Sequence, residues 1–161
     1  MKPTDRYYFT DAVHEVHNVL TGYGWARRGQ RRSVVSNSGR QRFNILGAYS
    51  PQDAEYLDLE TTENINAESV LQLVRKLETL HPEAERIVLI ADNARYNHAR
   101  LVREYLRGSR VEMVYLPAYA PNLNLIERLW KFMKKHIKRN RFYATFEQFV
   151  TAIQSFFASL S

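Results

Sequence analysis

The segment that most constrains the fold is a continuous apolar run, Arg86–Ala91 (RIVLIA), which ends at Asp92. A run of this length without polar alternation is typical of a strand buried on both faces of a sheet. Helical periodicity flanks it on both sides. Apolar residues recur at helical spacing between Asn66 and Leu80, with Asn66 as a candidate N-cap, and a second helix is expected from His98 to Leu106. A strand between two helices predicts an α/β sheet.

Four further strands are expected around this unit. Arg6–Asp11 (RYYFTD), Arg42–Ser50 (RFNILGAYS) and Val111–Leu116 (VEMVYL) are rich in aromatic and β-branched residues. Glu55–Glu60 (EYLDLE) alternates with a period of two and follows a predicted turn at residues 51–53. Gly22–Gly39 is predicted to be a loop, anchored at Trp25 by a short extra strand.

Two more helices complete the pattern. Leu123–Arg139 has an apolar stripe that includes Ile126, Trp130, Met133 and Ile137, and Thr145–Leu160 has a phenylalanine-rich face capped by Thr145. The order of elements predicts a mixed sheet of about five strands with helices on both faces, in one α/β domain over residues 1–161.

Composition narrows the classes of function. The chain has no cysteine, which excludes a disulfide scaffold, a thiolate metal site and a cysteine nucleophile. It has no apolar run long enough to span a membrane and no secretory leader, so we expect a soluble, cytoplasmic protein without a membrane partner.

Charge suggests a polyanionic partner. The 23 Lys and Arg residues against 17 Asp and Glu give a net charge of +6. No Lys or Arg occurs between Phe43 and Val74, where acidic residues accumulate. The basic residues cluster in two stretches, Arg27, Arg28, Arg31, Arg32, Arg40 and Arg42, and Lys131, Lys134, Lys135, Lys138, Arg139 and Arg141. One basic face for DNA is one interpretation, and two ordinary solvated surfaces is the other.

Three carboxylates are the candidate catalytic residues. Asp11 and Asp92 each end a predicted strand, and Glu127 stands about one turn inside the predicted helix Leu123–Arg139. Ligands of open α/β sheets tend to lie beyond the carboxyl ends of strands. Taken singly, each has an ordinary alternative: the two aspartates as strand-end caps, and Glu127 as a surface residue favoured by the helix dipole. Thirty-four residues separate Asp92 from Glu127, enough for one helix, one strand and a return to the sheet edge.

Several segments carry a family resemblance. Trp25–Gln30 (WARRGQ), Asn44–Ser50 (NILGAYS), Asp92–His98 (DNARYNH) and above all Leu116–Trp130 (LPAYAPNLNLIERLW) resemble segments of the DDE transposases of the mariner-like superfamily, in its bacterial insertion-sequence branch. Within the last segment the matching residues are Leu116, Pro117, Tyr119, Pro121, Leu123, Asn124, Ile126, Glu127 and Trp130. Six positions depart from the family pattern. Ala12 stands where many relatives have glutamate, Asn97 stands where histidine is common, and Ala118, Ala120, Asn122 and Leu125 replace the usual Pro, Ser, Asp and Pro of the last segment.

The resemblance implies a ribonuclease H-like catalytic domain that cleaves DNA, leaves a 3′-hydroxyl and transfers that strand into target DNA. Asp11, Asp92 and Glu127 would be the catalytic residues and the ligands of two Mg²⁺ or Mn²⁺ ions, with Asp11 bridging. We expect Arg27, Arg28, Arg31, Arg32, Lys131, Lys134, Lys135 and Lys138 to contact DNA, the four lysines projecting outward from their helix.

Partners follow from the same resemblance. The first partner is DNA, both as transposon ends and as target. The second is another copy of the chain in a homodimer. The third, if the recognition domain is absent, is a separately encoded helix-turn-helix protein. Competing interpretations are another ribonuclease H-like nuclease, a domesticated non-catalytic DNA-binding protein, and an interaction domain whose acidic residues are structural. His14 and His17, with Glu15 between them, lack the spacing of a zinc-protease motif, and we expect them to be surface or supporting residues.

Overall fold

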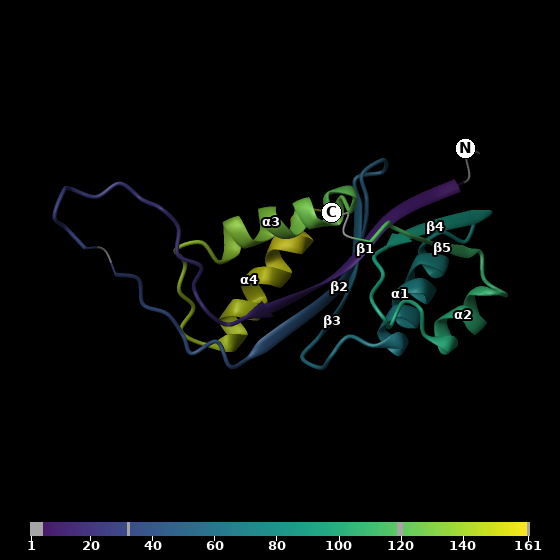
Figure 1. Cartoon of the computed structure of the whole chain (residues 1–161), viewed down its shortest axis with the longest axis horizontal. Helices are drawn as coiled ribbons and strands as arrows, with labels where there is room; N and C mark the ends of the chain where they lie inside the picture. Colours follow the sequence, from purple (N-terminus) through teal and green to yellow (C-terminus); the bar gives the residue numbers. More distant parts are fainter. Residues whose placement is uncertain (1–4, 32, 119–120, 161) are drawn as a thin grey trace.

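The computed structural model describes residues 5–31, 33–118 and 121–160, which form one mixed five-stranded sheet covered by helices (Figure 1). The strands are β1 (Asp5–Val16), β2 (Arg42–Ser50), β3 (Glu55–Thr61), β4 (Arg86–Ala91) and β5 (Val111–Tyr115), in the order β3-β2-β1-β4-β5. The helices are α1 (Ala67–Leu80), α2 (Arg100–Leu106), α3 (Ile126–Ile137) and α4 (Phe146–Ala158), and a 3₁₀ turn, η1 (Pro121–Leu123), precedes α3.

The central strand β1 changes partners along its length. Its first part, Asp5–Phe9, pairs in parallel with Arg86–Ile90 of β4. From Phe9 onward it pairs antiparallel with β2, as far as Val16 opposite Arg42. The second half of β1 therefore has β2 on one side and no β4 partner on the other.

Each face of the sheet has its own core, as the sequence predicts. On β2, Leu46 and Ala48 join the cluster under α1 and α2, whereas Phe43 and Ile45 join the cluster under α3 and α4. This alternation follows from the pleat, because successive strand residues point to opposite faces. The expectation of helices on both faces is confirmed.

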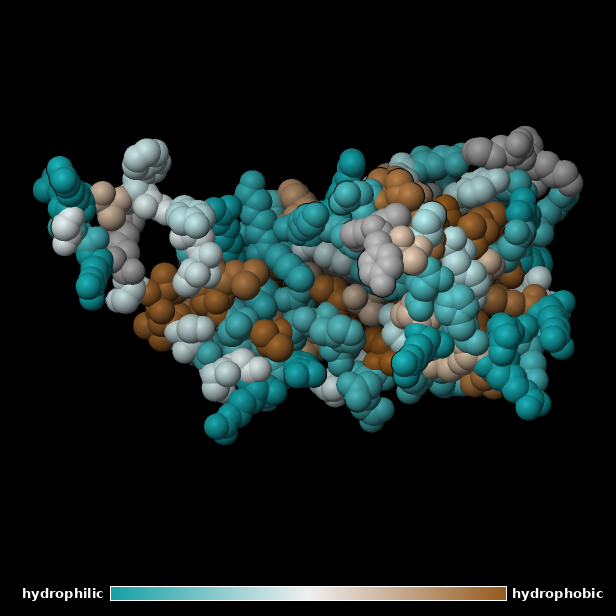
Figure 2. Space-filling view, viewed as in Figure 1, coloured by the Kyte–Doolittle hydropathy of each residue, from teal (hydrophilic) through white to brown (hydrophobic). Residues whose placement is uncertain are grey.

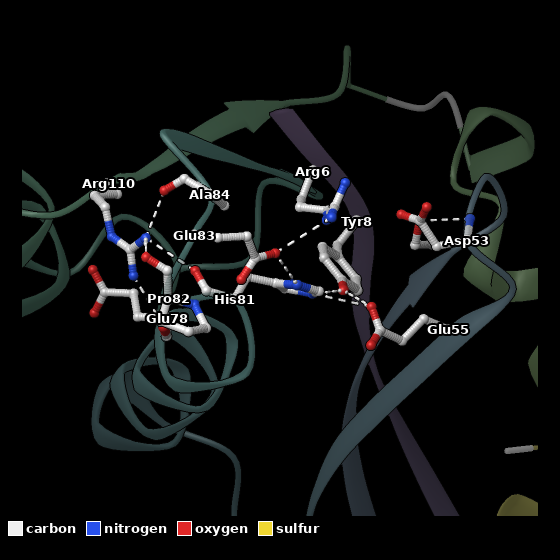
Figure 3. Close-up of polar contacts among 11 residues, drawn as sticks. Arg6, Tyr8, Asp53, Glu55, Glu78, His81, Pro82, Glu83, Ala84 and Arg110 are labelled. Atoms are coloured by element: carbon white, nitrogen blue, oxygen red, sulfur yellow. Dashed lines mark hydrogen bonds and ion pairs between the residues drawn. The ribbon is translucent and has the colours of Figure 1, made fainter. Parts of the chain in front are cut away.

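Polar groups fix the ends of α1. Asn66 is the N-cap: its Oδ1 accepts from the backbone N–H of Ser69 at 3.1 Å, and its own N–H donates to Ser69 Oγ. At the other end, Arg110 donates to the carbonyl oxygens of Glu78, His81, Pro82 and Ala84 (Figure 3). The last carbonyls of a helix have no partner within it, so a guanidinium there satisfies them.

A buried polar cluster ties α1 to the sheet near the start of β1 (Figure 3). The Tyr8 hydroxyl contacts both Glu55 and His81, and His81 Nε2 lies 3.0 Å from Glu55 Oε2. Tyr8 is fully buried, and burial together with Glu55 raises its pKa. The cluster therefore connects β1, the start of β3 and the end of α1 through hydrogen bonds.

The structure differs from the sequence prediction at several boundaries. The loop between β1 and β2 contains no extra strand within residues 17–31 and 33–41, and Trp25 is 98% exposed. The loop instead projects from the body of the molecule (Figure 2). Helix α2 begins at Arg100 rather than His98, and α3 begins at Ile126 rather than Leu123. No helix among the described residues is long and apolar enough to cross a membrane.

Candidate active site

Asp11 lies in the middle of β1, where the parallel ladder with β4 has already ended. The prediction that the first strand stops at Asp11 is wrong, because β2 continues the pairing to Val16. On the β4 side, however, the pairing stops at Phe9–Ile90, two residues before Asp11. Asp11 therefore lies beyond the end of the β1–β4 pairing but within the β1–β2 pairing. Its side chain is half-buried.

The Asp11 carboxylate has one close side-chain donor, the indole of Trp130. Nε1 of Trp130 donates to Asp11 Oδ2 at 3.2 Å, and the backbone N–H of Ala12 also bonds the carboxylate. Burial, followed by the charge of Asp92 and that of Glu127, raises the pKa of Asp11 to about 6, although both hydrogen bonds act to lower it. The ionised form is therefore dominant at neutral pH, but less favoured than in an ordinary aspartate.

Asp92 directly follows β4 and is held by the loop that it begins. Its Oδ1 accepts from the backbone N–H of Ala94 at 3.1 Å and from Nδ2 of Asn97 at 3.0 Å. Asn97 is buried and also donates to the Asp92 carbonyl at 3.3 Å, while Tyr115 Oη donates to the carbonyl of Asn97. Asp92 is therefore positioned by hydrogen bonds within residues 92–97, with β5 supporting the loop.

Glu127 lies in the first turn of α3, closer to the helix start than predicted. Its backbone N–H donates to the carbonyl of Asn124 at 3.1 Å. The Asn124 side chain in turn donates to the carbonyl of Thr10, the residue before Asp11, at 3.0 Å. The Glu127 carboxylate is half-buried and lies at the positive end of the helix dipole.

The structure brings the three predicted carboxylates together. The charges of Asp92 and Glu127 both act on Asp11, and Tyr96, whose pKa is raised mainly by burial, is also affected by Asp92 and Asp11. Within the described part of the chain, no three His, Cys, Asp or Glu side chains are close enough to hold one metal ion jointly.

The donor chemistry fits hard divalent cations. All three side chains offer carboxylate oxygens, the ligands that Mg²⁺ prefers. Burial first, and then the charges of Asp92 and Glu127, raise the pKa of Asp11, and a bound cation would stabilise its ionised form. The three carboxylates therefore form a candidate metal-binding site.

The predicted DNA contacts fall into two groups. Arg27, Arg28 and Arg31 are exposed on the projecting loop, and Arg32 lies outside the described residues, as does Tyr119 of the signature segment. On α3, Lys131 and Lys135 are exposed, but Lys134 pairs with Glu15 at 3.2 Å and is 39% exposed.

The expectation that all four lysines project outward is wrong for Lys138. It follows α3, is 3% exposed, and its Nζ lies 3.0 Å from Glu15 Oε2 and 2.9 Å from the carbonyl of Val16. Glu15 is buried as well, so its charge requires this partner. Lys138 is therefore a core residue and does not project toward DNA.

The base of the loop lies beside the end of α3. The N–H of Leu20 donates to the carbonyl of Lys138, and the N–H of Asn140 donates to that of Leu20. The N–H of Gly22 donates to Oδ1 of Asn140 at 3.0 Å. These bonds place the base of the loop next to the end of the second basic stretch.

The histidines near Asp11 have structural contacts. His14 Nδ1 lies 2.7 Å from Asn44 Oδ1, whereas His17 is buried, stacks on Phe149 and bonds the carbonyl of Tyr143. The expectation of surface or supporting histidines is therefore wrong for His17, which belongs to the core. His98 stacks on Tyr115, with ring centroids 4.0 Å apart.

The supporting residues of the site were not assigned from the sequence. Asn97 appeared there only as a departure from a family pattern, although an amide five residues after the acid, in a short loop, is a signal for a hydrogen bond back to it. The sequence indicates Asn124 only as a signature residue, and Trp130 as a signature residue and a member of the apolar stripe. Their bonds to Thr10 and Asp11 depend on the packing of α3 against β1.

Known proteins resemble the chain over nearly its whole length. It is 24% identical over 155 residues to the insertion element IS630 uncharacterized 39 kDa protein of Shigella sonnei, covering 96% of this chain and 45% of that protein. Among solved structures, the Mos1 transposase paired-end complex with left transposon end has a TM-score of 0.73 and 21% identity, covering 96% of this chain and 48% of that one. The Mos1 mariner paired end complex with Mn has a TM-score of 0.72 and 21% identity, with coverage of 96% and 48%.

These structural neighbours confirm the ribonuclease H-like fold. The chain spans about half the length of the relatives it matches. The family model for DDE superfamily endonuclease matches residues 6–150, which confirms the resemblance read from the sequence. Because this match includes β1, β4 and the start of α3, the elements that carry the three carboxylates, the chain belongs to the DDE superfamily endonuclease family.

Proposed function

We propose that this chain is a transposase catalytic domain that cuts DNA by metal-dependent phosphoryl transfer and joins the resulting 3′-hydroxyl to target DNA. The observation that carries the proposal is that Asp11 is half-buried within reach of the charges of Asp92 and Glu127, which raise its pKa together with burial, the larger cause. Similarity to Mos1 transposase complexes, one with a transposon end and one with Mn, supports DNA and a divalent metal as partners.

Each carboxylate has a role in this proposal. Asp11, Asp92 and Glu127 would together hold two Mg²⁺ or Mn²⁺ ions. Trp130 would orient the Asp11 carboxylate through Oδ2, and Ala94 and Asn97 would orient the Asp92 carboxylate through Oδ1. Two bound ions supply charge neutralisation at the scissile phosphate and activation of the attacking oxygen.

The protein's own contribution is positioning. Phosphoryl transfer needs little covalent participation by side chains. Catalysis therefore depends on how the protein orients the carboxylates and on how firmly it keeps them from other orientations. Asn97, Trp130 and Asn124 hold the carboxylates or the backbone next to them. The exposed residues Arg27, Arg28, Arg31, Lys131 and Lys135 would bind the DNA backbone, which gives affinity without sequence recognition.

The two tryptophans allow a direct test of metal binding. Trp130 is 4% exposed and bonds Asp11, whereas Trp25 is 98% exposed on the loop. In a ¹H–¹⁵N NMR titration with Mg²⁺, we expect the indole N–H of Trp130 to shift and that of Trp25 to stay in place. Trp130→Phe assigns the two signals. Indole signals that both remain unchanged at millimolar Mg²⁺ would contradict a metal site at Asp11.

A nicking assay on supercoiled DNA with Mn²⁺ tests the chemistry. Asp11→Asn, Asp92→Asn and Glu127→Gln should each abolish nicking while leaving the protein folded. Asp58→Asn is the matched control, because Asp58 is also a half-buried sheet aspartate with a raised pKa, but lies on β3 and accepts from Tyr56. Full nicking by Asp92→Asn would contradict the assignment, and Mg²⁺ binding without nicking by the wild type would favour a non-catalytic DNA-binding protein.

A further inference from the structure

Helix α3 is attached to β1 by two side-chain hydrogen bonds that flank Glu127. Asn124 precedes Glu127 by three residues and donates to the carbonyl of Thr10 at 3.0 Å. Trp130 follows Glu127 by three residues and donates to Asp11 Oδ2 at 3.2 Å. The two acceptors belong to consecutive residues of β1, so the first turn of α3 is tied to the strand on both sides of Glu127.

The end of the β1–β4 ladder explains why this attachment is possible. Pairing with β4 ends at Phe9, and the carbonyl of the next residue, Thr10, accepts from Asn124 instead. Residues three apart share a helix face, so Glu127 and Trp130 both lie toward the sheet. Asn124 and Trp130 are 3% and 4% exposed, which protects both bonds from competition by water.

Packing alone does not account for an asparagine at position 124. Its Oδ1 is buried and has no hydrogen-bond partner among the described residues, which costs stability. Leucine has a similar volume and would fill the same space without burying an unpaired oxygen. The amide therefore contributes through the bond from Nδ2 to Thr10, which fixes where α3 begins.

We propose that Asn124 and Trp130 are positioning residues that set the Glu127 carboxylate at a fixed place relative to Asp11. This inference rests on the proposed metal-dependent function, because a fixed spacing of two carboxylates matters most when they bind neighbouring cations. Groups that orient metal ligands typically change metal affinity by about 10- to 100-fold when they are removed.

The test compares Mn²⁺ affinity and stability in folded variants. Asn124→Leu removes the donor and keeps the volume, Trp130→Phe removes the indole N–H and keeps an aromatic ring, and Asn122→Ala is the control, because Asn122 is exposed in the same segment. We expect the dissociation constant for Mn²⁺, measured by calorimetry, to rise about tenfold in the first two variants and to stay unchanged in the control.

A second readout separates positioning from ligand loss. Raising the Mn²⁺ concentration should restore nicking by Asn124→Leu and Trp130→Phe, because their carboxylates are intact, and should not restore nicking by Glu127→Gln. Recovery of all three variants, or of none, would overturn the positioning role.

The outcomes distinguish this inference from the proposed function. Wild-type protein that does not bind Mn²⁺ would overturn both. Wild-type binding with unchanged affinity in Asn124→Leu and Trp130→Phe would overturn the positioning role alone. If Asn124→Leu does not fold, Trp130→Phe decides the question: a tenfold loss of affinity supports the inference, and wild-type affinity overturns it.

Discussion

Gly47 of β2 lies directly against the indole of Trp130: a Cβ atom at Gly47 would be 2.6 Å from Cη2 of Trp130 and 3.1 Å from Cδ1 of Ile126. Gly47 is also the residue paired with Asp11 across the β1–β2 ladder. The missing side chain therefore lets α3 approach the sheet at the position of Asp11. That approach brings Nε1 of Trp130 within 3.2 Å of the Asp11 carboxylate.

Gly47→Ala should displace Trp130 and loosen the site. A methyl group forced into a packed core costs about 1–3 kcal/mol, which would be measured as a lower free energy of unfolding in urea. The indole N–H of Trp130 should shift in NMR spectra as its bond to Asp11 weakens. Gly24→Ala is the control, because nothing lies within 4 Å of a Cβ built there. Wild-type stability and an unmoved indole signal in Gly47→Ala would show that the close approach has no consequence.

The sequence predicts the elements better than it predicts their ends. Apolar periodicity shows which residues are buried, so β2, β4 and the faces of α1 and α4 agree closely with expectation. Periodicity does not show where a ladder stops. Asp11 looked like the end of a strand because it is charged, but β1 continues to Val16, since β2 supplies partners that β4 does not.

The carboxylates could be chosen from the sequence, and their surroundings could not. Asp11, Asp92 and Glu127 follow from strand ends and a family resemblance, and in the structure the charges of Asp92 and Glu127 act on Asp11. The bonds from Trp130 and Asn124 join residues more than a hundred positions apart, so no local pattern indicates them. Lys138 looked like one of four solvated lysines, because helical periodicity could not reveal a buried Glu15 facing it from β1.

The buried pair of Glu15 and Lys138 should be important for stability. Lys138→Met leaves the buried Glu15 carboxylate with Lys134 alone and removes the bond to the carbonyl of Val16. Breaking a buried ion pair on one side costs about 3–5 kcal/mol, so urea unfolding should show a loss near the lower end of this range.

Two variants control this measurement. Lys135→Met removes an exposed lysine of the same helix and should change stability by less than about 0.5 kcal/mol. Glu15→Leu combined with Lys138→Met should recover much of the loss, because no unpaired charge remains buried. Equal stability of Lys138→Met and Lys135→Met would contradict a structural role for the pair.

The raised pKa of Asp11 predicts a specific pH dependence of the metal-free protein. Its folded-state pKa of about 6 lies above the 3.8 of an ordinary aspartate, so the folded protein binds more protons between these values. Stability should therefore fall as pH rises from about 4 to about 6, by at most about 3 kcal/mol from this group. The free energy of unfolding of Asp11→Asn, measured in urea at the same pH values, should not show this fall. An identical pH dependence of stability in the wild type and in Asp11→Asn would refute the prediction.

The affinity for Mg²⁺ should change with pH in the opposite direction to stability, and should increase as pH rises. Mg²⁺ competes with protons for the Asp11 carboxylate, so its apparent affinity should fall as pH decreases through about 6. The shift of the Trp130 indole N–H during Mg²⁺ titration, repeated at several pH values, measures this dependence. Affinity that stays constant across pH 6 would mean that Asp11 is not a ligand.

The exposed lysines of α3 should control the salt dependence of DNA binding. Replacing both Lys131 and Lys135 with glutamine removes two exposed charges, whereas the charge of Lys138 is already paired with Glu15. Each lost phosphate contact lowers the slope of log affinity against log salt by about 0.9, so the double variant should lose about two units of slope in fluorescence anisotropy. Lys76→Gln is the control, because Lys76 donates to the carbonyl of Asp58 in the acidic part of the chain. An unchanged slope in the double variant would assign Lys131 and Lys135 to ordinary solvation and leave DNA binding to the arginines of the loop.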